Sequence, residues 1–563
     1  MTWIRTTPDR DLADVVGRLA RAGSDPAGAV AAVAALVSAR SGRAEPLIIN
    51  GSVIAADPAV QAVPVDDGLL QRWGPWLPGL VREAVLSREA RHRQGVYHTP
   101  PEVVRALLLL TLNTGSSWNE QTRVLDPAVG GGAFLLAAAE LLAGPRANVA
   151  SRLVAVDIDP LAVATTRLAL ALWAQVPQET LPDDNFLTGD FLDPELLGTR
   201  QVDAVVGNPP FLSQLRGSTA RSAAARERIA LRWAGVGRYV DEAAAFALAA
   251  SECVAPGGTM TLVQPASVLA ARDAEPVRQR LEATVPLVAL WVDGGQRAFS
   301  AAVDTVALVS RRAAAPPTVR VGELAVPRPS PRSWGPLLAS SEGVPALDRP
   351  VGVTLSEVAT VTAGFRQHYY GLVGAVRDDR QGRYQLITSG LIDPLTNRWG
   401  ARQCRFAKQT FEAPTVDLNA VAPDVSDWVT ARLVPKVLVA SQTRVLEAFA
   451  DETGVCVPVT PVVSVEPHDV SSLWRFAALL TSPVATALLV GSASGTALSP
   501  GSVRVSASLI GELPLPNDES VWDEAARLAR EGKRDECGRV MLRAYGSAGR
   551  EDLLDWWRSR NPT

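Results

Sequence analysis

The chain has 563 residues, too many for one hydrophobic core, so two or three domains are expected. Hydrophobic residues make up 47% of it and charged residues 20%, as in an ordinary soluble protein, and its apolar stretches are too short or too interrupted to span a membrane. The four cysteines lack the spacing of metal ligands, and the first ten residues, where a signal peptide would begin, already include Arg5, Asp9 and Arg10. These features predict a cytoplasmic protein with reduced thiols and no metal site.

The net charge of −4 argues against a uniformly basic surface, so any contact with nucleic acid must come from local patches. The stretch 216–238 carries six arginines and only one acid, Glu227. In the stretch 366–408, seven arginines and one lysine outnumber the acids. Either patch could hold phosphates, and either could equally be a solvated face.

Residues 1–92 are rich in alanine and leucine and are expected to be mainly helical, with one helix over 27–39. They contain no carboxylate cluster followed by Glu-x-Lys, so no nuclease site is predicted there. We interpret this region as a cap or docking element.

A helix is predicted over 103–112, after the segment Thr99-Pro100-Pro101-Glu102. Thr99 is a good N-cap residue, with proline immediately inside the helix and Glu102 at the position of a capping box. The same helix start could instead receive the carboxylate of a ligand.

Residues 124–134 predict a strand, a glycine loop with Pro127 and Gly130, and the start of a helix. A glycine loop alone is weak evidence for a nucleotide. However, Asp126 at the strand end would repel a pyrophosphate and suit an ammonium group. A cofactor with an amino-acid tail and no phosphate therefore fits better than a dinucleotide.

Two further acids follow predicted strands. Asp157 ends the strand 153–156, where doubly wound folds bind ribose hydroxyls. Asp190 could accept a hydrogen bond from an adenine amino group, with Phe191 against the ring. Each acid alone is more often a cap, but together they favour S-adenosylmethionine as the cofactor.

The apolar strand 202–207 leads into Asn208-Pro209-Pro210-Phe211. The prolines keep this segment extended at the carboxyl edge of the sheet, where open α/β sheets bind ligands. The Asn208 side-chain oxygen and the Pro209 carbonyl could accept both N–H groups of a nucleobase amine, and Phe211 could stack on the base. The alternative is a strand that ends in proline beside a core phenylalanine.

From residue 95 to about 312, the chain resembles the gamma class of adenine-N6 DNA methyltransferases, the family of the TaqI methyltransferase. The order of segments is the same: Thr-Pro-Pro, glycine loop, Asn-Pro-Pro-aromatic, then a recognition domain. The resemblance implies that the methionine part is held by Thr99 and Asp126, and the ribose by Asp157. It also implies that Asp190 and Phe191 contact the adenine of the cofactor. The target base would be contacted by Asn208, Pro209 and Phe211, with Phe299 as a second aromatic residue.

The predicted fold is α/β: a seven-stranded, mostly parallel, Rossmann-like methyltransferase domain plus a smaller α+β target-recognition domain. The expected organisation is a helical region at 1–92, a catalytic domain at 93–315, a proline-marked linker at 316–350, a recognition domain at 351–516 and a helical region at 517–563. Double-stranded DNA is the expected partner, its backbone contacted by Arg216, Arg226, Arg232 and Arg238. We expect a monomer, with a restriction nuclease or defence system as a possible partner.

Several alternatives remain open from the residues alone. The same acceptors would serve cytosine N4, an RNA base or a protein glutamine, because each presents a planar amine. An inactive DNA-recognition subunit is also possible, although such a protein would have no need of Asp157 or Asp190. The recognition sequence cannot be read from the chain.

Overall fold

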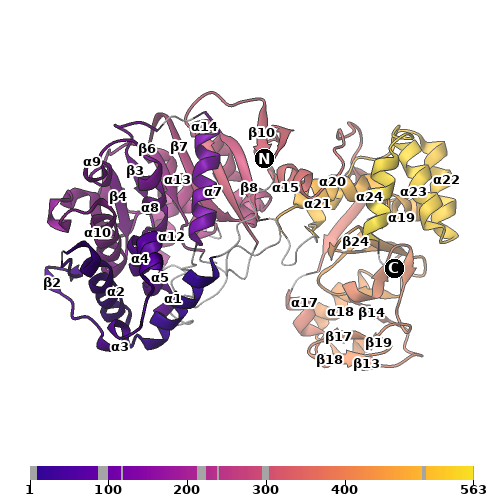
Figure 1. The fold of residues 1–563 in the computed structure, drawn as a ribbon. Coiled ribbons are helices and arrows are strands. Elements are labelled where there is room, and N and C mark those ends of the chain that lie inside the picture. Colours follow the sequence, from indigo (N-terminus) through magenta and orange to yellow (C-terminus); the bar gives the residue numbers. More distant parts are fainter. Residues whose placement is uncertain are drawn as a thin grey trace. The chain divides into compact units, whose positions relative to one another are not determined.

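The computed structural model describes residues 9–561, apart from 43, 87–98, 116–117, 212–222, 238–239, 294–303, 365 and 497–502. The chain divides into two compact units, Met1–Ser333 and Trp334–Thr563 (Figure 1). Each is described by itself.

Unit 1 begins with helices that pack onto the central sheet region. The predicted helix at 27–39 is confirmed as α2 (Pro26–Ser41). Helix α5 (Leu77–Val85) contacts α1, α2 and α10, and its apolar side chains lie in the same core cluster as the central strands. The remaining elements of this region are α1 (Arg10–Ala22), α3 (Pro58–Gln61), α4 (Asp67–Trp73) and the hairpin β1 (Ile48–Ile49) with β2 (Ser52–Val53).

A nine-stranded sheet forms the centre of unit 1, in the order β11-β10-β8-β9-β7-β6-β3-β4-β5. The five strands from β7 to β5 are parallel, whereas β9 runs antiparallel to both β7 and β8. The bounds are β3 (Val124–Asp126), β4 (Leu153–Asp157), β5 (Phe186–Thr188), β6 (Val202–Gly207), β7 (Val254–Pro265), β8 (Leu287–Val292), β9 (Thr305–Arg311), β10 (Thr318–Val321) and β11 (Leu324–Pro327).

The sheet has two more strands than predicted. Strands β10 and β11 lie within the segment 316–350, which its prolines had marked as a linker. Strand β10 pairs in parallel with β8, and β11 forms the edge of the sheet. An edge strand tolerates proline because one row of its N–H groups makes no ladder bond.

The order of the strands reverses between β3 and β6. From β3 the chain proceeds to β4 and β5 on one side, and from β6 to β7 on the other. Ligands of open α/β sheets bind at such a switch point, outside the carboxyl ends of the strands. The helices of this part are α7 (Pro101–Leu112), α8 (Ala133–Leu141), α9 (Arg146–Ala150), α10 (Pro160–Ala174), α11 (Pro194–Leu197), α12 (Ala223–Arg232), α13 (Glu242–Cys253) and α14 (Glu275–Thr284).

Unit 2 contains two four-stranded sheets, with orders β12-β24-β20-β22 and β13-β19-β14-β23. The described residues also form two small hairpins, β15–β16 and β17–β18, and the pair β21–β25. The bounds are β12 (Ala359–Ala363), β13 (Val376–Asp378), β14 (Gln385–Ile387), β15 (Ile392–Asp393), β16 (Thr396–Asn397), β17 (Cys404–Phe406), β18 (Gln409–Phe411), β19 (Pro414–Val416), β20 (Lys436–Ala440), β21 (Gln442–Thr443), β22 (Glu447–Asp451), β23 (Cys456–Pro458), β24 (Val462–Pro467) and β25 (Val503–Arg504).

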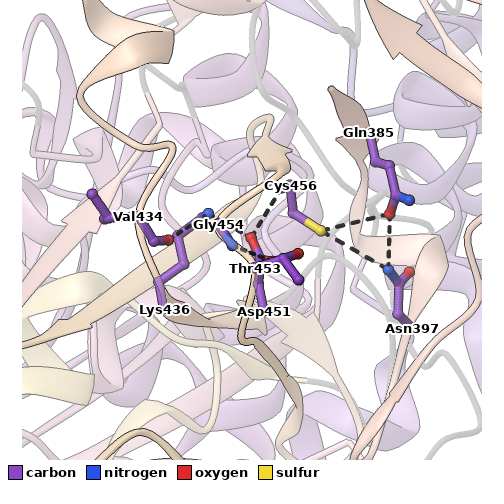
Figure 2. Close-up of polar contacts among 8 residues, drawn as sticks. All are labelled: Gln385, Asn397, Val434, Lys436, Asp451, Thr453, Gly454 and Cys456. Carbon is purple, nitrogen blue, oxygen red and sulfur yellow. Dashed lines mark hydrogen bonds and ion pairs between the residues drawn. The ribbon is translucent and has the colours of Figure 1, made fainter. Parts of the chain in front are cut away.

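A buried polar network connects the two sheets of unit 2 (Figure 2). Lys436 Nζ on β20 pairs with Asp451 Oδ2 on β22 at 2.7 Å, and both side chains are almost fully buried. Asp451 also accepts from the backbone N–H of Cys456 on β23, and the Cys456 thiol donates to Gln385 Oε1 on β14 at 3.7 Å. A buried ion pair persists only when its remaining donors and acceptors are satisfied, and here backbone and side-chain groups do this.

Helices cover the rest of unit 2, and the predicted helical segment after 517 is present as α22, α23 and α24. Trp522 and Trp557 are buried in its core cluster. Among the residues described, no single helix is long and apolar enough to cross a membrane. The segments Val470–Leu480 and Pro483–Ala493, bent by 65° at the break between them, reach that length and apolar composition only when they are taken together. The helices are α15 (Gly335–Ser341), α16 (Leu355–Val358), α17 (Arg366–Gly371), α18 (Pro423–Thr430), α19 (Leu473–Leu480), α20 (Pro483–Ala493), α21 (Ala507–Gly511), α22 (Glu519–Arg530), α23 (Arg534–Ala544) and α24 (Glu551–Arg560).

Candidate functional site

Asp126 and Asn208 lie at the switch point, because Asp126 ends β3 and Asn208 directly follows the adjacent strand β6. Gly207 makes this approach possible. A Cβ atom at position 207 would lie 2.6 Å from Asp126 Oδ1 and 3.2 Å from the ring of Pro127. A side chain there would therefore push the carboxylate away from the end of β6.

Thr99 is not the N-cap of α7, which was one of the two roles considered for it. Helix α7 begins at Pro101 with Pro100 as its cap residue, and no side chain caps it. Instead, Thr99 is buried, and its Oγ1 accepts a hydrogen bond from Asn208 Nδ2 at 3.0 Å. Because this bond uses the amide nitrogen, it fixes the orientation of the Asn208 side chain and turns its oxygen the other way.

Asp126 is a buried carboxylate, with 1% of its surface exposed. Its Oδ1 accepts from the backbone N–H of Ala128 at 3.0 Å. Burial raises the pKa of Asp126 well above its usual value, and the neighbouring charge of Asp157 raises it further. A carboxylate in this state gains most from a bound cation, which fits the ammonium group predicted at this position.

Asp157 connects the end of β4 to the glycine loop. Its Oδ2 accepts from the backbone N–H of Gly130 at 2.9 Å, and its Oδ1 accepts from that of Asp159 at 3.0 Å. Burial raises the pKa of Asp157, and these hydrogen bonds and the charge of Arg82 oppose the rise. Each carboxylate oxygen can accept a second hydrogen bond, so ribose hydroxyls still fit.

Ile158 was not singled out from the sequence. It follows Asp157 directly, and 73% of its surface is exposed, although it is a large aliphatic residue. Such a residue beside a ligand-binding edge offers an apolar face to a planar ring. Its position after a strand-end acid was the available signal, but its exposure could not be read from the chain.

Asp190 and Phe191 follow β5. Asp190 Oδ1 accepts from the backbone N–H of Leu192 at 3.0 Å. Phe191 is 5% exposed, and its ring stacks on Phe246 of α13, with centroids 5.5 Å apart. Little of the Phe191 ring therefore remains for the predicted contact with adenine.

The prolines after Asn208 differ in exposure: Pro209 is buried and Pro210 is half-buried. Phe211 is 8% exposed and belongs to the core cluster of unit 1. This burial agrees with the alternative of a core phenylalanine, and stacking on a base would use only the edge of the ring that remains accessible. Phe299 lies outside the described residues.

Of the four arginines predicted to contact the DNA backbone, only the side chain of Arg232 is described; Arg216, Arg226 and Arg238 lie outside the described side chains. Arg232 pairs with Glu252 at 2.5 Å and donates to the carbonyl of Leu192. It also lies over the ring of Trp233. Its charge is thus engaged within unit 1, which does not support a contact with phosphate.

Comparison with known proteins shows that the part of the chain that holds this site is similar to a known family. Residues 80–284 match the family described as N-6 DNA methylase. The chain is 32% identical over 120 residues to a Type II methyltransferase, M.XamI, from Xanthomonas campestris pv. amaranthicola; the match covers 21% of this chain and 20% of that protein.

A solved structure of the Type IIL restriction-modification enzyme MmeI in complex with DNA has a similar fold. The similarity covers 91% of this chain and 83% of that one, with a TM-score of 0.58 and 11% identity. At this identity it bears on the fold alone, and it agrees with the α/β methyltransferase fold predicted from the sequence. Thr99, Asp126, Asp157 and Asn208 all lie within the part of the chain, residues 80–284, that matches the N-6 DNA methylase family.

Proposed function

We propose that this chain is a site-specific DNA methyltransferase that transfers a methyl group from S-adenosylmethionine to N6 of an adenine flipped out of duplex DNA. The observation that carries the proposal is the pair of strand ends at the switch point. There the Asn208 amide, oriented by Thr99, follows the end of β6, and the buried Asp126 carboxylate lies against Gly207, the residue before Asn208. One group suits the amine that is to be methylated, and the other suits a cationic cofactor.

The residues of the glycine-loop side fit the cofactor. When bound, S-adenosylmethionine supplies a methyl group on a positively charged sulfur. Asp126 would hold its ammonium group, Asp157 its ribose hydroxyls, and the exposed side of Ile158 would cover its adenine. Burial of Asp126 supports this assignment, because an ionised carboxylate at that depth is stabilised by a bound cation.

Asn208 would act on the target amine. Its side-chain oxygen and the Pro209 carbonyl would accept the two N–H groups of the base, and these bonds would strengthen as positive charge develops on nitrogen. Thr99 would support this step indirectly, because its hydroxyl holds the Asn208 amide in the orientation that directs the side-chain oxygen to the target amine. The proton of the amine can leave after transfer, so no strong base is required.

Unit 2 would read the DNA sequence, with the recognition domain over 351–516 as proposed from the sequence. The hairpin β17–β18 supports this role. Arg405 and Thr410 are directly opposite each other and exposed, and Lys408 is exposed at the tip. A two-stranded ribbon of this kind fits the major groove of DNA.

MmeI is a restriction-modification enzyme solved in complex with DNA, and M.XamI is a Type II methyltransferase. Similarity to these two proteins favours a role for this chain in a restriction-modification system. Transfer of tritiated methyl from the cofactor to DNA, RNA and protein fractions tests the reaction. Label in DNA, released as N6-methyladenine, is the expected result. Label as N4-methylcytosine would correct the base, and label only in RNA or protein would overturn the proposal.

A further inference from the structure

Helix α5 touches the glycine loop backbone to backbone. A Cβ atom at Gly79 would lie 2.0 Å from the carbonyl oxygen of Gly131, and one at Gly131 would lie 2.9 Å from the backbone of Gly79. Two glycines are thus needed for this contact. Helix α5, the last helix described in the region predicted as a cap, therefore forms the outer wall of the loop that follows β3.

Side chains of α5 continue this contact with polar groups. Glu83 Oε1 accepts a hydrogen bond from the backbone N–H of Gly131 at 3.2 Å. Arg82 is 1% exposed and forms an ion pair with Asp159. Asp159 in turn caps α10 by accepting from the backbone N–H of Leu161 at 2.9 Å.

These contacts close a circuit around the cofactor side of the switch point. Glu83 on α5 accepts a hydrogen bond from Gly131, and the adjacent Gly130 donates one to Asp157. Asp157 also accepts from the backbone N–H of Asp159, and the Asp159 carboxylate forms the ion pair with Arg82 on α5. The helix, the glycine loop and the end of β4 therefore hold one another in place.

We propose that Arg82 and Glu83 are positioning residues for the methyl donor, which fix the glycine loop and Asp157 from outside the site. The inference rests on the proposed function for the identity of the ligand, but not for the circuit itself. Each acts through the backbone or carboxylate that it holds: Glu83 through Gly131, and Arg82 through Asp159 and Asp157. Residues 77–86, which the sequence had grouped with an N-terminal cap or docking element, thereby become part of the cofactor-binding machinery.

The charge of Arg82 has a further effect on Asp157. The charged groups that face Asp157 are Arg82 on α5, Asp126 on β3 and its own neighbour Asp159. Arg82 lowers the pKa of Asp157, whereas Asp159 raises it. Loss of Arg82 should raise this pKa further, so that Asp157 loses its charge at a higher pH and the acid limb of cofactor affinity moves to higher pH.

Calorimetric titration with S-adenosylhomocysteine, from pH 5.5 to 8.5, tests the proposal in the full chain. Arg82→Met should weaken binding by about tenfold or more and shift the acid limb upward, and Arg82→Lys should recover part of the loss. Glu83→Ala should weaken binding, whereas Glu83→Gln should restore it, because an amide oxygen can still accept from Gly131. The matched control is Arg328→Met, which breaks the Arg328–Glu282 ion pair elsewhere in unit 1 and should leave the affinity within twofold.

Amide hydrogen exchange over 127–132 in the ligand-free protein separates this proposal from the proposed function. Arg82→Met and Glu83→Ala should speed exchange in this loop, and Arg328→Met should not. If the folded variants kept wild-type affinity, pH profile and loop exchange, the circuit would have no positioning role. If wild-type protein failed to bind S-adenosylhomocysteine, the proposed function would fall, while the exchange data would still decide whether α5 holds the loop.

Discussion

Asn208 and Asp157 lie at one sheet edge but have different partners, so their loss should have different consequences. Asp157 accepts from the glycine loop and would bind ribose hydroxyls equally before and during transfer. Asp157→Ala should therefore mainly raise KM for the cofactor, and high cofactor should restore much of the rate. Asn208→Ala should lower the rate constant by about 10²–10³, the effect of losing one oriented group at a developing charge.

Single-turnover methylation, combined with calorimetric titration of the cofactor, distinguishes these two outcomes. Cofactor affinity should hardly change in Asn208→Ala, and no cofactor concentration should rescue its rate. If this variant instead lost cofactor binding and kept its saturated rate, the assignment of Asn208 to the target amine would be wrong.

Asp126 should lower the stability of the folded protein near neutral pH and at the same time strengthen cofactor binding. Burial raises the pKa of Asp126 in the folded protein above the ordinary value of 3.8, so the folded state favours the protonated side chain. This stabilisation of the fold is fully present below pH 3.8 and is lost as the pH rises through the raised pKa. Asp126→Asn should therefore melt at a higher temperature than wild type, with a difference that grows as the pH is raised from 4. The same variant should bind the cofactor about 10- to 100-fold more weakly, because a hydrogen bond to a charged group is worth about 1.5–3 kcal/mol. Equal melting curves at all pH values, or unchanged affinity, would contradict this assignment.

At this scale the sequence predicted the positions of the acids but not their surroundings. Asp126 and Asp157 could be placed because an acid after an apolar strand is a local pattern. The bond between Thr99 and Asn208 joins residues 109 positions apart, so the near neighbours of Thr99 suggested only a helix cap or a contact with the cofactor. Phe191 was expected at the ligand, and its stacking on Phe246 depends on how α13 packs.

At the scale of elements, hairpin β17–β18 is built to hold its tip in an unusual conformation. Ala407 and Lys408 both have positive φ, 48° and 68°, although neither is glycine. The backbone N–H of Ala407 donates to the Tyr369 hydroxyl at 2.9 Å, and the Tyr369 ring lies against Phe406. Strained backbone of this kind persists where surrounding contacts enforce it, often at a binding surface.

We expect this hairpin to contact DNA. Arg405→Ala combined with Lys408→Ala should weaken binding and reduce the slope of log K against log salt by about 0.9 for each phosphate that the double variant no longer neutralises. Lys533→Ala is the matched control, because Lys533 is also exposed in unit 2 but is paired with Glu531. Filter binding or fluorescence anisotropy over a salt series gives both quantities. Identical slopes for the double variant and wild type would exclude phosphate binding by this hairpin.

The edge of the central sheet shows why elements were harder to predict than strand-end residues. Prolines at 316, 317, 327, 329 and 331 indicated a linker, yet Pro327 ends β11 in the sheet. Proline excludes a central strand but not an edge strand, and position within the sheet is a property of the whole fold. The parallel strands β3, β4 and β6 were predictable because continuous apolar runs are typical of strands buried on both faces.

At the scale of the whole molecule, the family match and the candidate site lie in unit 1, and unit 2 has its own core. The N-terminal helices share the core of the catalytic sheet, with Leu12, Trp73 and Leu80 in the same cluster as Val124 and Leu135. Their apolar faces are therefore used to support the domain built on the central sheet. This packing favours a structural role for the described part of this region over an independent catalytic one.

The chain should accordingly methylate DNA without cutting it. Purified protein incubated with plasmid, Mg²⁺ and S-adenosylmethionine should leave the plasmid intact on a gel, while methylation-sensitive sequencing reveals one modified adenine context. The Asn208→Ala protein, treated in parallel, should leave the plasmid both intact and unmodified, since it retains the fold but lacks an acceptor at the reacting amine. Discrete fragments that appear with wild-type protein and with Asn208→Ala would reveal a nuclease site separate from the switch point. In that event the helices before α7 could no longer be regarded as support for the methylase domain alone.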